Sequence, residues 1–256
     1  MRCALTIAGF DPSGGAGLQA DLRVFQSFGL HGLSVAAALT AQNADGVRAV
    51  APVAPSFVFS QLETLLEQFR PRAVKIGMLL TPGNVRAIAT AIETHCLRNV
   101  VLDPVAVSTS GYRLAGRGTL KAVRSDLLPL CDVITPNMAE AAALTGVDVR
   151  TRAEMERAAA MIREYGARNV VITGGHLKKE SADLFFNGRA VWIEARKLPG
   201  EYHGTGCAYS SAVASLLATG STPLAAASEA KEFVSAAIAA ASKTRGRMKF
   251  LKIGRA

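Results

Sequence analysis

The chain passes through Tyr202-His203-Gly204-Thr205-Gly206-Cys207 and then enters an Ala- and Leu-rich segment at 208–217. That segment predicts a helix, and Gly220 is a suitable residue for ending it. The glycines of the preceding turn let the backbone approach a ligand closely. The first amide N–H groups of a helix have no intrahelical partner and lie at the positive end of its dipole. The pattern therefore predicts an anion site, most often one for phosphate.

Cys207 lies inside this turn. Its thiol pKa is expected to fall there, because a helix N-terminus favours the thiolate. The alternative interpretation is an ordinary loop in which Cys207 only packs, since short glycine motifs have many chance matches. The chain's other cysteines, Cys3, Cys96 and Cys131, make no Cys-x-x-Cys pair, so nothing indicates a zinc or thioredoxin-type site. We expect all of them to be reduced.

Composition favours an α/β protein. Half of the 256 residues are hydrophobic and 6% are aromatic, which suits helices packed on a buried parallel sheet. No apolar run has the length of a membrane span, and the N-terminal run is too short for a signal peptide, so we expect a cytoplasmic protein with no membrane partner. The net charge of +9 is concentrated in a basic tail from about residue 244, which we expect to be loosely ordered. Without an aromatic stacking platform, this charge does not indicate a nucleic-acid partner.

A strand, a polar or glycine-rich loop and a helix recur along the chain, which predicts a parallel sheet with right-handed crossovers. We expect strands at 3–9, 33–39, 73–79, 99–104, 131–135 and from 169, with a polar loop at 40–46, a short strand at 47–53 and a hairpin at 183–194. Helices are expected at 18–28, 55–69, 84–95, 118–128, 139–144, 152–165, 208–217 and 221–243. No linker or repeat divides the chain, so residues 1–256 form a single predicted domain.

Polar residues cluster in the loops that follow the predicted strands. These loops are 11–17, 42–43, 103–104, 137–140 and 203–207. In an open α/β sheet, the carboxyl ends of the strands are where ligands bind. The spacing of Asn137 and Glu140 also matches a capping box at a helix start, and this interpretation is compatible with a ligand site. The loop at 11–17 matches neither a Walker A sequence nor a dinucleotide fingerprint.

Together these segments resemble one family, the hydroxymethylpyrimidine and phosphomethylpyrimidine kinases of thiamine biosynthesis, within the ribokinase-like superfamily. The matching segments lie at 9–22, 40–43, 75–79, 135–141, 174–177 and 203–207, in family order. The resemblance implies a three-layer fold, with a mostly parallel central sheet and helices on both faces. It implies ATP- and Mg²⁺-dependent phosphoryl transfer to the hydroxymethyl group of 4-amino-5-hydroxymethyl-2-methylpyrimidine, and leaves open transfer to its monophosphate.

The resemblance also implies roles for single residues around the reacting groups. Cys207 would be the base that takes the hydroxyl proton, and the amides of Gly204, Thr205 and Gly206 would hold the developing charge. The implied substrate-binding residues are Gly9, Asp11, Asp21, Gln42, Met78 and Val105. Among these, Gln42 would recognise the aminopyrimidine edge, because an amide both donates and accepts. Met78 and Val105 would form apolar walls, although such residues also occur as ordinary core, and a structural role alone would explain Asp21.

For the nucleotide, the resemblance implies contacts from Asn137, Thr173 and Gly175. It implies Mg²⁺ held by Asn137, Glu140 and Asp103, mostly through waters. Relatives are often dimeric, and closed two-fold dimers are the commonest oligomers, so we expect a homodimer.

Departures from the family pattern keep two alternatives open. Thr109 and Thr173 stand where relatives commonly carry lysine, which removes positive charge from the nucleotide side. The usual C-terminal Gly-x-Gly-x-x-Pro-x-His tail is replaced by a sequence that contains Met248, Lys249 and Phe250. One alternative is a pyridoxal or pyridoxine kinase, whose substrate also carries a CH₂OH on a six-membered heteroaromatic ring. The other is a non-catalytic pyrimidine-binding protein.

Overall fold

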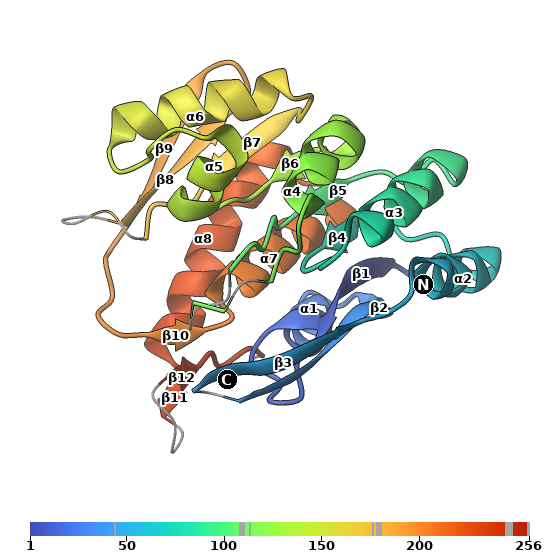
Figure 1. Ribbon diagram of the computed structural model, residues 1–256. Coiled ribbons are helices and arrows are strands. Elements are labelled where there is room, and N and C mark those ends of the chain that lie inside the picture. Colours follow the sequence, from blue (N-terminus) through green and yellow to red (C-terminus); the bar gives the residue numbers. More distant parts are fainter. Residues whose placement is uncertain are drawn as a thin grey trace.

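A nine-stranded sheet forms the middle layer of the protein (Figure 1). The computed structural model describes residues 1–43, 45–107, 111–112, 114–175, 177, 181–243 and 248–254. The strand order is β3-β2-β1-β4-β5-β6-β7-β8-β9. The strands are β1 Cys3–Phe10, β2 His31–Asn43, β3 Gly46–Pro52, β4 Val74–Ile76, β5 Val100–Leu102, β6 Val133–Ile134, β7 Asn169–Ile172, β8 Ser181–Phe186 and β9 Ala190–Ala195. The pairs from β2 through β1 and β4 to β7 are parallel, and antiparallel pairs add β3, β8 and β9. The predicted mostly parallel sheet is confirmed.

Helices cover both faces of this sheet. One face carries α1 Gly17–Ser27, α7 Thr205–Thr219 and α8 Pro223–Ala239. The other carries α2 Pro55–Gln68, α3 Pro82–Thr94, α4 Thr119–Ala122, α5 Met138–Thr145 and α6 Arg152–Glu164, which Figure 1 shows along one side of the strands. Successive strand residues supply the two cores in turn: Ala4 packs with α7 and α8, whereas Leu5 packs with α2 and α3. The three-layer architecture predicted from the sequence is therefore confirmed.

Helix ends follow the predicted chemistry. The helix α7 begins after Gly204, whose φ is +79°, and ends at Gly220, whose φ is +106°. Both residues adopt the left-handed region that glycine occupies at little cost. At the start of α5, Asn137 and Glu140 form the reciprocal hydrogen bonds of a capping box, which satisfies two backbone donors. None of the helices in the described part of the chain combines the length and apolar character needed to cross a membrane.

Several element boundaries differ from prediction, and the strand expected at 73–79 is shorter, since β4 covers Val74–Ile76. Residues 40–43, expected as a loop, extend β2 and pair with β3, because an antiparallel neighbour satisfies their backbone. Residues 118–128, expected as one helix, divide into α4, a π-helical turn η1 Val123–Leu127 and a 3₁₀ turn η2 Leu128–Leu130, where Pro129 removes a backbone donor. The last helix ends at Ala239. The predicted hairpin at 183–194 is confirmed as β8 and β9.

The basic tail is more ordered than expected where the structure describes it. A small second sheet joins β10 Tyr202–His203, β12 Lys249–Phe250 and β11 Ser242–Lys243 (Figure 1). Met248 and Leu251 flank β12, and each is only 6% exposed. The prediction of loose order is therefore wrong for residues 248–251, because the apolar side chains of Met248 and Leu251 interrupt the basic run and are buried in the fold. Residues 244–247, in the same tail, lie outside the described residues.

Candidate active site

The carboxyl ends of the parallel strands bring the predicted site residues to one edge of the sheet. Asp11 follows β1, Asp103 follows β5 and Asn137 follows β6. Asn137 forms an isolated parallel bridge with Thr173, directly after β7. The helix α7 joins this edge through Ser210, whose hydroxyl donates to Asp103 Oδ2 at 3.1 Å. Residues that are up to about 200 positions apart in the chain thus surround one region.

The start of α7 has the geometry of an anion site. The first hydrogen bond of the helix runs from the Ala208 N–H to the Gly204 carbonyl at 2.9 Å, so the amides of 205–207 precede the helical ladder. A Cβ on Gly204 would lie 1.9 Å from the Gly15 carbonyl oxygen, so only glycine fits at this position. The two glycine turns are therefore in direct contact, and helix amides without an intrahelical partner lie beside Asp103.

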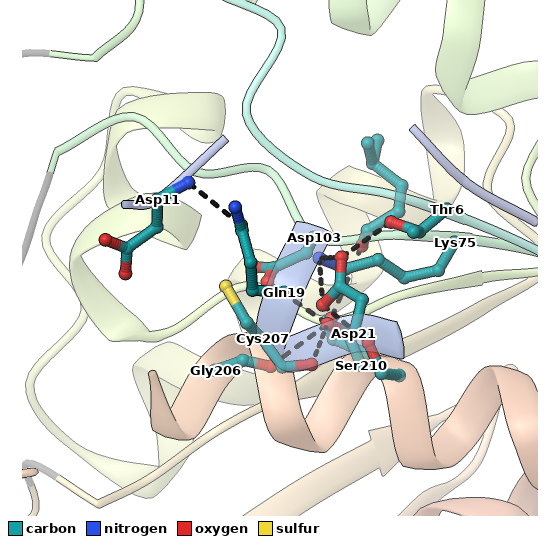
Figure 2. A network of polar contacts seen from close by, with 12 residues as sticks. Thr6, Asp11, Gln19, Asp21, Lys75, Asp103, Gly206, Cys207 and Ser210 are labelled. Carbon is teal, nitrogen blue, oxygen red and sulfur yellow. Dashed lines mark hydrogen bonds and ion pairs between the residues drawn. The ribbon is translucent and has the colours of Figure 1, made fainter. Parts of the chain in front are cut away.

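Cys207 lies on the first turn of α7, near Asp103 (Figure 2). Burial raises the pKa of its thiol to about 12; Lys75 lowers it, while the negative charges of Asp103 and Asp21 raise it further. The thiol also forms a hydrogen bond with Asp103. The expected fall in the thiol pKa is therefore wrong for the protein without ligands, because desolvation and two carboxylates outweigh the helix terminus and Lys75.

A buried ion pair supports this region from below. The Lys75 side chain on β4 points toward Asp21 on α1 (Figure 2), and the distance from its ammonium to Asp21 Oδ2 is 2.9 Å. Neither side chain has exposed surface. The Asp21 carboxylate also accepts from Thr6 at 2.6 Å and from Ser211 at 2.7 Å. The acceptor positions of Asp21 are thus occupied by protein donors, and the residue lies beneath the site rather than on its surface.

Two further carboxyl groups fit a divalent cation. Burial raises the pKa of Asp103, with Lys75 acting in the opposite direction. Burial and the charge of Asp103 raise the pKa of Glu140 to about 8, against the lowering effect of the Asn137 N–H at 2.9 Å. A cation would stabilise both carboxylates in their ionised form. The described residues contain no group of three His, Cys, Asp or Glu side chains suited to a metal, so water and phosphate oxygens would supply the remaining Mg²⁺ ligands.

An apolar pocket wall lies beside the reacting groups. Met78 is 8% exposed and packs in a small cluster with Val105 as a partly buried neighbour. A Cβ on Gly9 would lie 2.3 Å from the Met78 methyl carbon, so glycine lets Met78 rest on the β1 backbone. At the end of β2, the Gln42 side chain forms a hydrogen bond with Asp11. The structure thus brings together five of the six predicted substrate residues, which are Gly9, Asp11, Gln42, Met78 and Val105.

Asp11 organises the loop that follows β1. Its carboxylate accepts from the amides of Ser13 and Ala16, each at 2.8 Å, and lies 3.0 Å from His203 Nε2. Burial opposes ionisation, but the hydrogen bonds from His203, Ser13 and Gln42 together hold the pKa of Asp11 at about 2. Asp11 is therefore an ionised, buried acceptor that ties the loop to β10.

On the nucleotide side, Thr173 donates its N–H to the Pro136 carbonyl at 2.9 Å. Gly175 has open space around it, since an added Cβ would meet nothing within 4 Å. The nearby Lys231 is paired with Asp183 at 2.8 Å. Thr109 lies outside the described residues, so the structure does not describe its surroundings.

Two relationships escaped sequence reasoning. The pair of Lys75 with Asp21 is one of them, although a lysine inside the apolar run 73–79 is itself a signal for a buried ion pair. The contact of His203 with Asp11 is the other, because no local pattern links two residues that are 192 positions apart.

The fold and this edge define a kinase with a ribokinase-like α/β architecture. The chain belongs to the phosphomethylpyrimidine kinase family, whose model matches residues 11–250. A hydroxymethylpyrimidine/phosphomethylpyrimidine kinase from Rhizobium meliloti is 44% identical over 244 residues, covering 94% of this chain and 91% of the relative. A kinase family argues against the non-catalytic interpretation.

Two other similar proteins bear on substrate choice and length. A thiamine biosynthesis bifunctional protein from Geobacter sulfurreducens is 41% identical over 91% of this chain, which spans 48% of that relative's length. The crystal structure of an ADP complex of Bacillus subtilis pyridoxal kinase superposes with a TM-score of 0.90 at 36% identity, covering 99% of this chain and 97% of the other. Kinases of both substrate classes are therefore similar to this chain.

Proposed function

We propose that this protein transfers the γ-phosphoryl group of ATP to the hydroxymethyl group of 4-amino-5-hydroxymethyl-2-methylpyrimidine in thiamine biosynthesis. The observation that carries this proposal is the placement of Cys207, beside Asp103 and at the unsatisfied start of α7, on the edge that also holds the Met78 pocket wall. The pyrimidine ring of the substrate would lie against Met78 and Val105, with Gln42 at its polar edge. This orientation directs the hydroxymethyl group toward Cys207.

Phosphoryl transfer depends mainly on positioning and charge neutralisation. The amides of Thr205, Gly206 and Cys207 would hold the equatorial oxygens of the transferring group. Cys207 would accept the hydroxyl proton as the new P–O bond forms. Because the resting thiol already forms a hydrogen bond with Asp103, that carboxylate offers an onward acceptor for the thiol proton. The positive charge of Lys75 favours any negative charge that develops on the sulfur.

Asp103, Glu140 and Asn137 would hold Mg²⁺ together with water. When bound, the ion neutralises charge on the nucleotide phosphates. Thr173 and Gly175 would contact the nucleotide from the end of β7, where the space around Gly175 leaves its backbone accessible.

The second candidate is a pyridoxal or pyridoxine kinase, which the similarity to the Bacillus subtilis enzyme favours. The test offers hydroxymethylpyrimidine, its monophosphate or pyridoxal separately, each with ATP and Mg²⁺, and resolves the products by mass. The proposal expects pyrimidine monophosphate, and diphosphate from the monophosphate if both steps occur. Pyridoxal phosphate as the sole product would select the second candidate.

We also propose that the enzyme works as a cytoplasmic homodimer. Phe10 and Leu39 are register partners on β1 and β2, and they are 41% and 50% exposed. Adjacent exposed apolar side chains favour a self-complementary contact. A reducing compartment would keep the Cys207 thiol free. Light scattering at micromolar concentration should give the mass of two chains, and a monomer would contradict the proposal.

A further inference from the structure

Three segments that are distant in the sequence meet at Gly15. A Cβ on Gly15 would lie 2.1 Å from His203 Cδ2 and 2.6 Å from Phe250 Cε1, so both rings contact the Gly15 backbone. The His203 and Phe250 rings are themselves 5.5 Å apart at a tilt of 59°. The loop after β1, the turn before α7 and the C-terminal strand β12 thus share one contact.

The orientation of the His203 ring depends on packing as well as on hydrogen bonding. Its Nε2 lies 3.0 Å from Asp11 Oδ2. Its Nδ1 is buried and has no hydrogen-bond partner within the ranges that the structure describes. One polar contact leaves a ring free to tilt about that contact, so the Phe250 ring supplies the second constraint.

The strand β12, which carries Phe250, is held on both sides by other strands. Tyr202 and His203 of β10 pair in parallel with Lys249 and Phe250, and β11 pairs on the other side (Figure 1). Leu251, the next residue, is 6% exposed and packs in the core beneath α7 and α8. The strand pairs of β12 and the burial of Leu251 therefore hold the Phe250 ring in place.

We propose that Phe250 is a positioning residue for phosphoryl transfer. It holds the His203 ring, and His203 holds Asp11, whose carboxylate fixes the amides of Ser13 and Ala16 in the loop after β1. The same loop presses the Gly15 carbonyl against Gly204 at the start of α7. Phe250 thereby sets the distance between the loop after β1, at 11–17, and the turn before α7, at 203–207. This inference rests on the proposed function for its catalytic consequence.

The test compares Phe250→Ala with Phe250→Tyr, which keeps the ring, and with Ile253→Ala. Ile253 is a matched control because it lies in the same tail, packs on the core and lines a hollow with Arg23 and Gln26 of α1. Hydrogen exchange by mass spectrometry follows the ligand-free proteins, and steady-state kinetics give kcat and KM separately. The exchange measurement does not depend on knowing the substrate.

In Phe250→Ala, amides in peptides covering 11–17 and 203–208 should exchange about tenfold faster, while peptides from β1 and β5 stay unchanged. The kcat should fall about tenfold, with KM within about twofold, because small displacements of reacting groups reduce the rate strongly. Phe250→Tyr should restore both properties, and Ile253→Ala should leave both near wild type.

Faster exchange confined to 242–254, or an equal loss of kcat in Ile253→Ala, would overturn the proposal. Faster exchange throughout the core would also overturn it, since that result indicates general destabilisation. If the wild-type protein phosphorylates none of the three substrates, the proposed function fails, and the exchange pattern alone still decides whether Phe250 holds the two loops together.

Discussion

Lys75 Nζ lies 2.9 Å from Asp21 Oδ2, and the pair is completely buried between β4 and α1. The same carboxylate binds Thr6 from β1 and Ser211 from α7, so one buried anion joins the sheet to the helix that carries Cys207. A buried ion pair of this kind is costly to break, because the remaining partner keeps its charge without compensation.

The first prediction concerns this pair. Lys75→Met should lower the free energy of unfolding by about 3–5 kcal/mol, because it leaves the Asp21 charge buried and unpaired. Urea denaturation provides the measurement. The double variant Asp21→Asn with Lys75→Met should recover part of the loss, since neither residue then carries a charge. A loss below about 1 kcal/mol in the single variant would contradict the importance of the pair.

A second prediction follows from the pKa of Asp11, which is held at about 2. A carboxyl whose folded pKa lies below its unfolded value stabilises the protein above the unfolded value, near 4, and this stabilisation is lost as the pH falls toward 2. The shift corresponds to about 2 kcal/mol at neutral pH. Asp11→Asn should therefore flatten the loss of stability between about pH 4 and 2, as measured by urea unfolding across that range. An unchanged slope would argue against the shifted pKa.

The pKa of Glu140 is shifted in the opposite direction to that of Asp11. Burial and Asp103 raise its pKa to about 8, so part of the population is protonated at neutral pH. Binding of Mg²⁺ with nucleotide should release a proton from Glu140 and strengthen as the pH rises through about 8. Calorimetry in buffers of different ionisation enthalpy counts that proton. Glu140→Gln should abolish this proton release; a release that persists in the variant would assign it to another group.

The thiols should differ in reactivity. Cys96 is exposed, Cys3 and Cys131 are buried, and the pKa of Cys207 is raised to about 12. At pH 7 iodoacetamide should therefore modify Cys96 first, with activity retained, because the thiolate is the reacting form. Peptide mass spectrometry against residual activity gives the order. Rapid loss of activity through Cys207 would show that its thiol ionises more easily than its burial indicates.

The sequence was sufficient for the elements that depend on local pattern. Alternating strands, loops and helices predicted the parallel sheet, Gly220 marked the end of α7, and the spacing of Asn137 and Glu140 predicted their capping box. These features are set by residues within a few positions of one another, and local propensity and capping govern them directly.

What the sequence left out depends on contacts between distant segments. The extension of β2 through 40–43 requires β3 as a partner, and the polar residues of this segment resemble a loop when the partner strand is not considered. The two-residue strand β12 exists only because β10 and β11 lie beside it. The pKa of Cys207 follows the same rule: the helix terminus is a local signal, whereas burial and the charges of Asp103 and Asp21 come from the assembled fold.

The role of Cys207 as the base is tested most sharply by the turnover of hydroxymethylpyrimidine with ATP and Mg²⁺, in wild-type protein and in Cys207→Ala, with the product identified by mass. We expect pyrimidine monophosphate from the wild-type protein. In the variant, kcat should fall about 100-fold or more, with KM within about twofold, because a positioned base contributes to the chemical step and not to binding. Unchanged turnover in Cys207→Ala would rule out Cys207 as the base, and no pyrimidine product from the wild-type protein would rule out the proposed reaction.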